Sequence, residues 1–324
     1  MKFPGEKLII KLWDTLADNG IGSLLKPWQI RREAEAQADS LLVISQAEKL
    51  AQEIRDGEKQ VILNSKYPII DSRGSSQPEH YSQLSRAITD LSNDIIRERV
   101  RKEINISKAI LEAEEELKQK SQAPPEKSID DDWLFTWREN TGKCSNEYMQ
   151  ALWGKVLAGE LLSPRQYSFR TLDFLRTLSV DDAKFIEEKF AFVINRRIII
   201  ENPELLRKYK FTFEDRLKLQ ELGLVSGAEG TLSVTYNKIP QLSPIDLISY
   251  NKNLRLIPIK PESKVKYKQC LLTTLGNEIS LIGEFQPNEE YLNYIARSAV
   301  SNGFRVIEYD HDLTTHMLTN GVEF

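Results

Sequence analysis

The segment from Asp131 to Phe190 constrains the fold most, because it predicts three closely spaced helices with recognisable ends. Ser145 can cap the first helix, whose apolar positions form one broad stripe before Ser163 and Pro164 end it. A second helix starts at Ser168, and Ser179 followed by Asp182 predicts a capping box for a third. Amphipathic helices this close together predict a compact helical hub.

Tryptophans mark the same segment and the start of the chain. Trp133 and Trp137 are spaced i, i+4, which predicts a short leading helix with both rings over one groove. Large aromatic residues at helical spacing usually build a core, and a surface for a partner is the alternative. The candidate interaction residues are Leu12, Trp13, Trp28, Trp133, Trp137 and Trp153.

The residues before the hub predict long helices. Leu8 to Leu16 form the apolar face of a first helix, which Asn19 and Gly20 end. A long helix is expected from Gln29 to about Asp56, residues 64–80 read as a loop, and helix resumes from about Tyr81 to Lys120. Two long helices separated by a loop predict a helical hairpin or an oligomerising stalk.

The predicted fold class is mainly α, with a small α+β part at the end. Its expected divisions are a long-helix domain at 1–120, a linker at 121–132, the helical hub at 133–194 and an α+β region at 195–324. Within the last region, a helix at 213–222, a glycine-containing turn and an alternating strand predict a winged-helix-like unit at 205–237. Strands near 254–259, 264–273 and 304–310 and helices at 274–282 and 287–301 complete the α+β region.

Basic residues in this region are the candidate nucleic-acid contacts, and they are Arg216, Lys218, Lys260, Lys264, Lys266 and Lys268. Arg216 and Lys218 share their helix with three acidic residues, which favours a purely structural helix. Three of the lysines can share one strand face. Lysines that protect an exposed sheet edge explain this pattern as well as a DNA or RNA patch does.

Composition and the absence of known motifs exclude several classes of functional site. The net charge is −4, and the two cysteines form no CxxC pair, so neither a disulfide framework nor a structural zinc site is indicated. No P-loop, GxGxxG, GxSxG or HExxH motif is present, so no catalytic residue, cofactor or metal is predicted. His311 and His316 could share a metal only if their segment were helical, and solvated side chains are the expected reading.

The chain has no apolar run long enough to span a membrane, which predicts a cytoplasmic protein. The amphipathic start offers a second possibility, a peripheral membrane contact through Leu12, Trp13, Trp28 and neighbouring apolar residues. Docking of this face on the hub, or on a second subunit, is the expected alternative.

Three stretches carry a resemblance, namely PGEKLIIKLWDTLADNGIGSLLKPWQIRRE, YMQALWGKVLAGELLSPRQYSFRTLDFLRTLSVDDAKF and LTTLGNEI. Together they resemble an uncharacterised bacterial and prophage-associated family of unknown function, over nearly the whole chain. Residues 145–190 are also similar to the abortive-infection alpha family of phage-related proteins. Neither resemblance supplies a catalytic motif, and both imply mobile elements, phage conflict and a role through interaction.

The leading hypothesis is therefore a non-enzymatic protein of a mobile element or prophage that acts in phage defence through protein contacts, with a homo-oligomer or another protein as partner. The alternatives are a winged-helix nucleic-acid-binding regulator and a peripheral membrane effector.

Overall fold

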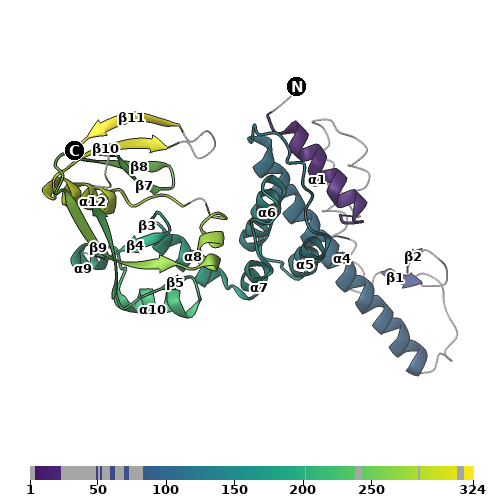
Figure 1. The fold of residues 1–324 in the computed structure, drawn as a ribbon. Coiled ribbons are helices and arrows are strands. Elements are labelled where there is room, and N and C mark those ends of the chain that lie inside the picture. The colour runs from purple at the N-terminus through teal and green to yellow at the C-terminus, as the bar shows by residue number, and fades with distance from the viewer. Residues whose placement is uncertain are drawn as a thin grey trace. The chain divides into compact units, whose positions relative to one another are not determined.

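The computed structural model of the chain describes residues 4–22, 49, 52, 59–62, 69–72, 83–200, 202–237, 243–283, 285–311 and 317–324. These residues form two compact units, Met1–Thr177 and Leu178–Phe324. Figure 1 shows helices dominating the first unit and strands the second. The division falls within the range that the sequence groups as one helical hub. Most of the predicted helix at 29–56, most of the loop at 64–80, and Trp28 lie outside the described residues.

The first unit is helical apart from one β-hairpin. Its elements are α1 (Glu6–Asp18), β1 (Lys59–Ile62), β2 (Ile69–Ser72), α4 (Gln83–Lys118), α5 (Asp131–Gly142), α6 (Glu147–Leu162) and α7 (Phe169–Thr177). α4 has 36 residues and is therefore about 54 Å long. It is the helix against which α1, α5 and α6 pack (Figure 1). The sequence-based expectations of α1, α4, α5, α6 and α7 are confirmed.

Close backbone approach brings α4 and α6 together. A Cβ atom on Gly154 would lie 2.8 Å from the carbonyl oxygen of Ala109, so a larger residue here would push the helices apart. Polar side chains also cross between helices in this core. Asn105 donates to the Gly142 carbonyl at 2.8 Å, and Gln150 donates to Asn105 Oδ1 at 3.1 Å. These bonds satisfy buried polar groups that would otherwise destabilise the unit.

The ends of the helices follow the capping chemistry of the sequence, with one correction. Ser179 accepts a hydrogen bond from the backbone N–H of Asp182 at the start of α8 (Val180–Phe190), as predicted. The expected cap of α6, however, is wrong by one residue. Asn146, and not Ser145, accepts from the N–H of Met149 at 3.2 Å. Both residue types cap well, so the sequence alone does not choose between neighbours.

The second unit contains two antiparallel sheets, so the expectation of a mainly α fold is wrong. Of the residues that the structure describes, about 50% are helical and 20% lie in strands. The elements are α8 (Val180–Phe190), β3 (Val193–Ile194), β4 (Arg197–Ile199), α9 (Pro203–Lys208), α10 (Phe213–Glu221), β5 (Val225–Ser226), β6 (Leu232–Asn237), β7 (Ile245–Ser249), β8 (Lys252–Pro258), β9 (Lys264–Leu272), α11 (Thr274–Ile279), α12 (Glu289–Ser301), β10 (Phe304–His311) and β11 (Leu318–Glu323). Strands β7 and β11 are short segments that the sequence analysis missed.

One sheet is organised around β9. β4 pairs with β9 on one side, and β5 and β6 both pair with it antiparallel on the other. The predicted glycine-containing turn lies between β5 and β6. These two strands follow one another along β9 and do not pair with each other. Their partner lies beyond a long intervening stretch of chain, and local patterns do not reveal such pairings.

The other sheet has the order β11, β10, β8, β7. Its hairpin β7–β8 is inserted between β6 and β9, and its hairpin β10–β11 ends the chain. Alternate residues of β8 and β10, including Leu254, Leu256, Phe304 and Val306, are fully buried, and α12 packs on these strands. The side chains between these positions, such as Arg255 and Arg305, face away from this core.

Candidate binding surface of the second unit

Helix α10 occupies a defined place in the β9 sheet unit. The chain runs through α8, β4, α9, α10, β5 with β6, and finally β9, while the sheet order places β9 between β4 and the β5–β6 strand. Helix α10 therefore directly precedes β5 and β6, which pair with the central strand β9.

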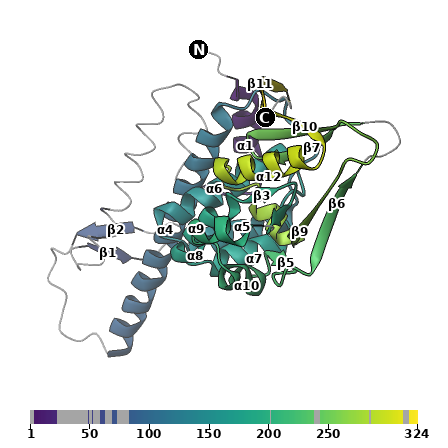
Figure 2. The same ribbon diagram turned by 90° about the vertical axis from the view of Figure 1, so that its left-hand side faces the viewer.

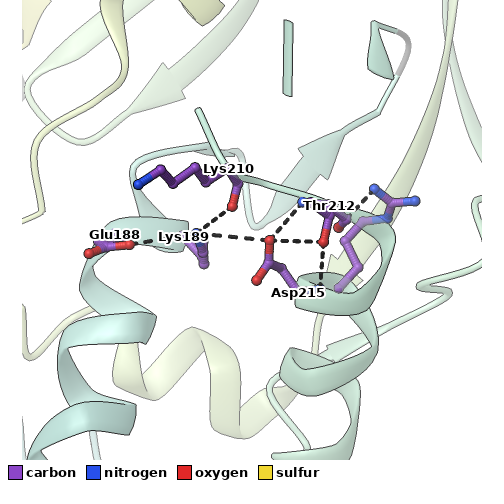
Figure 3. A network of polar contacts seen from close by, with 6 residues as sticks. Glu188, Lys189, Lys210, Thr212 and Asp215 are labelled. Atoms are coloured by element: carbon purple, nitrogen blue, oxygen red, sulfur yellow. Dashed lines mark hydrogen bonds and ion pairs between the residues drawn. The ribbon is translucent and has the colours of Figure 1, made fainter. Parts of the chain in front are cut away.

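A buried lysine fixes the start of α10. Lys189 of α8 is only 4% exposed, and its Nζ donates to the carbonyl of Lys210 at 2.6 Å. The same ammonium group lies 3.9 Å from Asp215 and 3.6 Å from Glu188 (Figure 3). Asp215 in turn accepts from the N–H of Thr212 at 2.7 Å, which completes a capping box at the N-terminus of α10. The residues next to Lys189 in the sequence form no pattern that predicts its burial, so it was not a candidate residue.

The two basic residues of α10 contact the unit itself. Arg216 donates to the carbonyls of Ala228 at 3.0 Å and Thr212 at 3.3 Å. Lys218 Nζ forms an ion pair with Asp182 at 2.7 Å, and a hydrogen bond from Lys218 is the main reason why the pKa of Asp182 is lowered. Both candidate nucleic-acid residues on α10 are therefore engaged in internal contacts.

The exposed residues of α10 are aromatic, acidic or neutral. They are Phe213, Glu214, Gln220 and Glu221. Phe213 is 42% exposed although it is a large apolar side chain, and Glu214 has a lowered pKa, first because it accepts a hydrogen bond from its own backbone. The helix therefore presents negative charge beside an exposed aromatic ring. The sequence contained these residues, but only the structure separates them from the basic residues that face inward.

The lysines of β9 are placed differently. Lys264, Lys266 and Lys268 are exposed, whereas Val265 and Tyr267 between them are buried. The prediction that three lysines share one face of a strand is confirmed. Lys260 lies outside the row, in the turn before β9, where its N–H donates to Ser263 Oγ at 3.1 Å.

The candidate interaction residues of the first unit lie in its core. Trp133 donates to the carbonyl of Tyr167 at 2.8 Å, Trp137 donates to that of Trp153 at 2.9 Å, and Trp13 donates to Glu114 at 3.1 Å. The exposed fraction is 5% or less for Leu12, Trp13, Trp133, Trp137 and Trp153. In this arrangement these side chains stabilise the unit and are not displayed to a partner.

The apolar face of α1 packs inward as well. Leu8, Leu12 and Leu16 are buried, and α1 lies against α4 and α6. Lys11, on the other face of α1, donates to the carbonyls of Pro125 and Lys127. These contacts hold the predicted membrane-facing residues of α1 against the rest of the unit.

Two further expectations concern a metal site at His311 and His316 and the lack of a membrane-spanning helix. Tyr309 to His311 belong to strand β10, so the helix required for a shared metal site is absent there, while His316 lies outside the described residues. No group of three or more potential metal ligands occurs in the part of the chain that the structure describes. Within that part, no helix is both long and apolar enough to cross a membrane.

Residues 92–204 match a protein family described as "Protein of unknown function (DUF2806)". The match extends from within α4 to the start of α9. It confirms the expectation of an uncharacterised family over these residues, whereas the opening segment and α10 lie outside it. Comparisons with curated proteins and with solved structures find no match.

Proposed function

We propose that this chain is a non-enzymatic binding protein whose second unit uses α10 to contact another protein. The observation that carries the proposal is the charge distribution of α10. Arg216 and Lys218 are engaged within the unit, whereas Glu214 and Glu221 are exposed. A helix with this surface repels phosphates, so the second unit serves here to present α10 to a protein.

The same surface specifies the chemistry of the partner. Phe213 supplies an aromatic ring that a shallow apolar pocket can bury, and buried aromatic side chains commonly dominate the binding energy of protein interfaces. Glu214 and Glu221 favour lysines and arginines around that pocket. The partner is therefore a protein with an apolar pocket rimmed by basic residues, and a second copy of this chain is one form that it can take.

The biological setting that we propose is phage defence or exclusion by a mobile element or prophage. It rests on the resemblance of the opening segment and of residues 145–190 to phage-related families, and α10 supplies the physical means of interaction. Deletion of the gene should change phage plating for part of a broad phage panel. Unchanged plating on every phage, together with the absence of any co-purifying protein, would contradict a role in phage defence or exclusion.

The direct test is to isolate the full chain from its host at low salt, measure its native mass and identify the bound protein. Binding of that protein is then measured for Phe213→Ala and for Glu214→Lys/Glu221→Lys. Each variant should weaken binding at least tenfold, because the first removes the aromatic contact and the second reverses both exposed charges.

A matched control separates this surface from net charge. Glu204→Lys/Glu262→Lys makes the same change in charge at two other exposed glutamates of the second unit. The control should bind as the unmodified chain does. Equal weakening by the control, or unchanged binding by both α10 variants, contradicts the assignment of α10.

A further inference from the structure

The strands β6 and β9 form a two-stranded ribbon with one basic face. In the antiparallel register Lys264 lies opposite Asn237, Lys266 opposite Thr235 and Lys268 opposite Ser233. Figure 2 shows the two strands side by side at the right of the view. Opposite residues of an antiparallel pair point to the same face, so the three lysines alternate with small polar residues on that face.

The opposite face of the ribbon is held by the core. Tyr267 is 1% exposed, and its hydroxyl donates to the carbonyl of Ile295 in α12 at 3.2 Å. The Tyr236 ring packs edge-on against Tyr267 with the centroids 6.3 Å apart. Since Tyr267 is anchored in this way, the lysines of β9 point outward in a fixed direction.

The two strands of the ribbon supply no negative charge to the basic face. Neither strand contains an acidic residue. Lys264 and Lys266 form no ion pair with any residue that the structure describes. Successive lysines of the row are spaced by two residues, or about 6.6 Å along the strand. A linear array of phosphates is the ligand chemistry that complements a row of this kind.

We propose that this basic face binds the phosphate backbone of a nucleic acid without reading its sequence. Lysine ammonium groups supply the electrostatic attraction, and the hydroxyls of Ser233 and Thr235 and the amide of Asn237 can donate hydrogen bonds to phosphate oxygens. The acidic residues of α10 repel phosphates and keep that helix out of the major groove of DNA. Binding is therefore confined to the basic face of the β6–β9 ribbon, and it does not depend on the protein partner proposed for α10.

Protection of a sheet edge is the alternative explanation for the lysines, because charge on an edge strand prevents pairing with another chain. β6 pairs with β9 along 264–269, whereas β4 pairs with β9 only at 269–271. Lys264 and Lys266 therefore lie on a part of β9 that is paired on one side among the described strands. Measured binding to nucleic acid distinguishes the two explanations.

The experiment measures binding of fluorescent single-stranded DNA, duplex DNA and single-stranded RNA to the full chain across a salt series. The unmodified chain should bind at low salt, with little preference among sequences. Lys264→Gln/Lys266→Gln should reduce the slope of log affinity against log salt by about 1.8 on duplex or about 1.4 on a single strand. Lys264→Arg/Lys266→Arg should retain binding, because it keeps both charges.

The matched control is Lys127→Gln/Lys184→Gln, which removes two exposed lysines that are not part of the ribbon. Circular dichroism and thermal unfolding establish that each variant is folded. The proposal is overturned if the unmodified chain retains none of the three nucleic acids at low salt, or if the control loses affinity as much as the ribbon variant. Binding to phosphatidylserine vesicles without binding to any nucleic acid would assign the face to an anionic membrane instead.

Discussion

Helix α10 and the β6–β9 ribbon both belong to the second unit, but their basic residues are placed in different ways. On α10 Arg216 and Lys218 contact a carbonyl or a carboxylate of the same unit, although the Lys218 side chain stays 44% exposed, and Glu214 and Glu221 are exposed. On the ribbon the lysines face outward, and neither strand contains an acidic residue. Two sets of residues that looked equivalent in the sequence therefore receive different assignments, one structural and one for binding.

The reason lies in what surrounds each element. α10 packs beside α8, whose Asp182 and Phe185 are within reach of Lys218, with the ammonium group 4.3 Å from the ring centroid. Long cationic side chains next to such partners form internal contacts. The ribbon has core contacts on one face only, through Tyr267.

The largest effect is expected for Lys189→Ala, which removes the buried cation that fixes the start of α10. The variant loses a packed side chain and leaves the Lys210 carbonyl without its donor, so we expect the free energy of unfolding to fall by roughly 3 kcal/mol. Hydrogen exchange of α8 and α10 measures the loss. Tryptophan fluorescence does not, because all five tryptophans lie in the first unit.

Lys184→Ala is the control for this prediction, since Lys184 lies on the same helix and is exposed. It should change the free energy of unfolding by less than about 0.5 kcal/mol. Similar protection of α8 and α10 from exchange in both variants would show that Lys189 does not hold α10.

The same contrast between internal and displayed charge applies to Glu114 in the first unit. Glu114 is 7% exposed and accepts from Trp13 Nε1, and burial raises its pKa to about 7 from an ordinary value of 4.5. Its contribution to stability is complete below pH 4.5 and is lost as the pH rises through about 7, because the folded state must then ionise a buried carboxyl. The loss should be on the order of 2 to 3 kcal/mol.

Glu114→Gln sharpens this prediction, because glutamine keeps the acceptor for Trp13 and cannot ionise. Urea unfolding followed by tryptophan fluorescence at pH 5 and pH 8 should show a nearly constant free energy of unfolding for the variant and a decline for the unmodified chain. A parallel decline in both proteins would show that another group titrates. Glu112→Gln on the same helix is the control, and it should follow the unmodified chain.

Arg216→Ala tests the inward role of the α10 cations at smaller magnitude. The variant removes hydrogen bonds to Ala228 and Thr212 and the contact with the Phe213 ring. We expect a loss of about 1 to 2 kcal/mol in the free energy of unfolding and no change in the salt dependence of nucleic-acid binding. If a folded Arg216→Ala protein shows a smaller slope of log affinity against log salt, Arg216 contacts nucleic acid and α10 is part of the binding surface.

Sequence patterns located most helices because the signals for helices are local. The Ser179–Asp182 cap and the ends of α1 and α6 follow from residues within a few positions of each other. The sheets were harder to predict because their pairing is not local. β5 and β6 find their partner in β9 only after the β7–β8 hairpin has intervened, and β11 is a polar, mostly exposed strand without alternation.

For the candidate site, too, placements that depend on local alternation could be predicted, and placements that depend on distant segments could not. Alternation within β9 was enough to predict that Lys264, Lys266 and Lys268 share a face. The inward direction of Arg216 and Lys218, by contrast, depends on Ala228 and Asp182, which other segments supply. Burial of Lys189 likewise requires the turn at Lys210 to fold over α8.

The smallest predicted effect concerns the Lys218–Asp182 pair, which is partly exposed. Lys218→Ala should lower the free energy of unfolding by less than about 1 kcal/mol at neutral pH, because exposed ion pairs are screened by solvent. Asp182 has a lowered pKa in the folded state, so the contribution of the pair is present above its ordinary pKa of 3.8 and is lost as the pH falls through the folded value. The difference between Lys218→Ala and the unmodified chain should therefore shrink in acid and in 1 M salt, as hydrogen exchange of α8 and α10 can measure. A difference that persists under both conditions would mean that Lys218 acts mainly by packing over Phe185 and not by its charge.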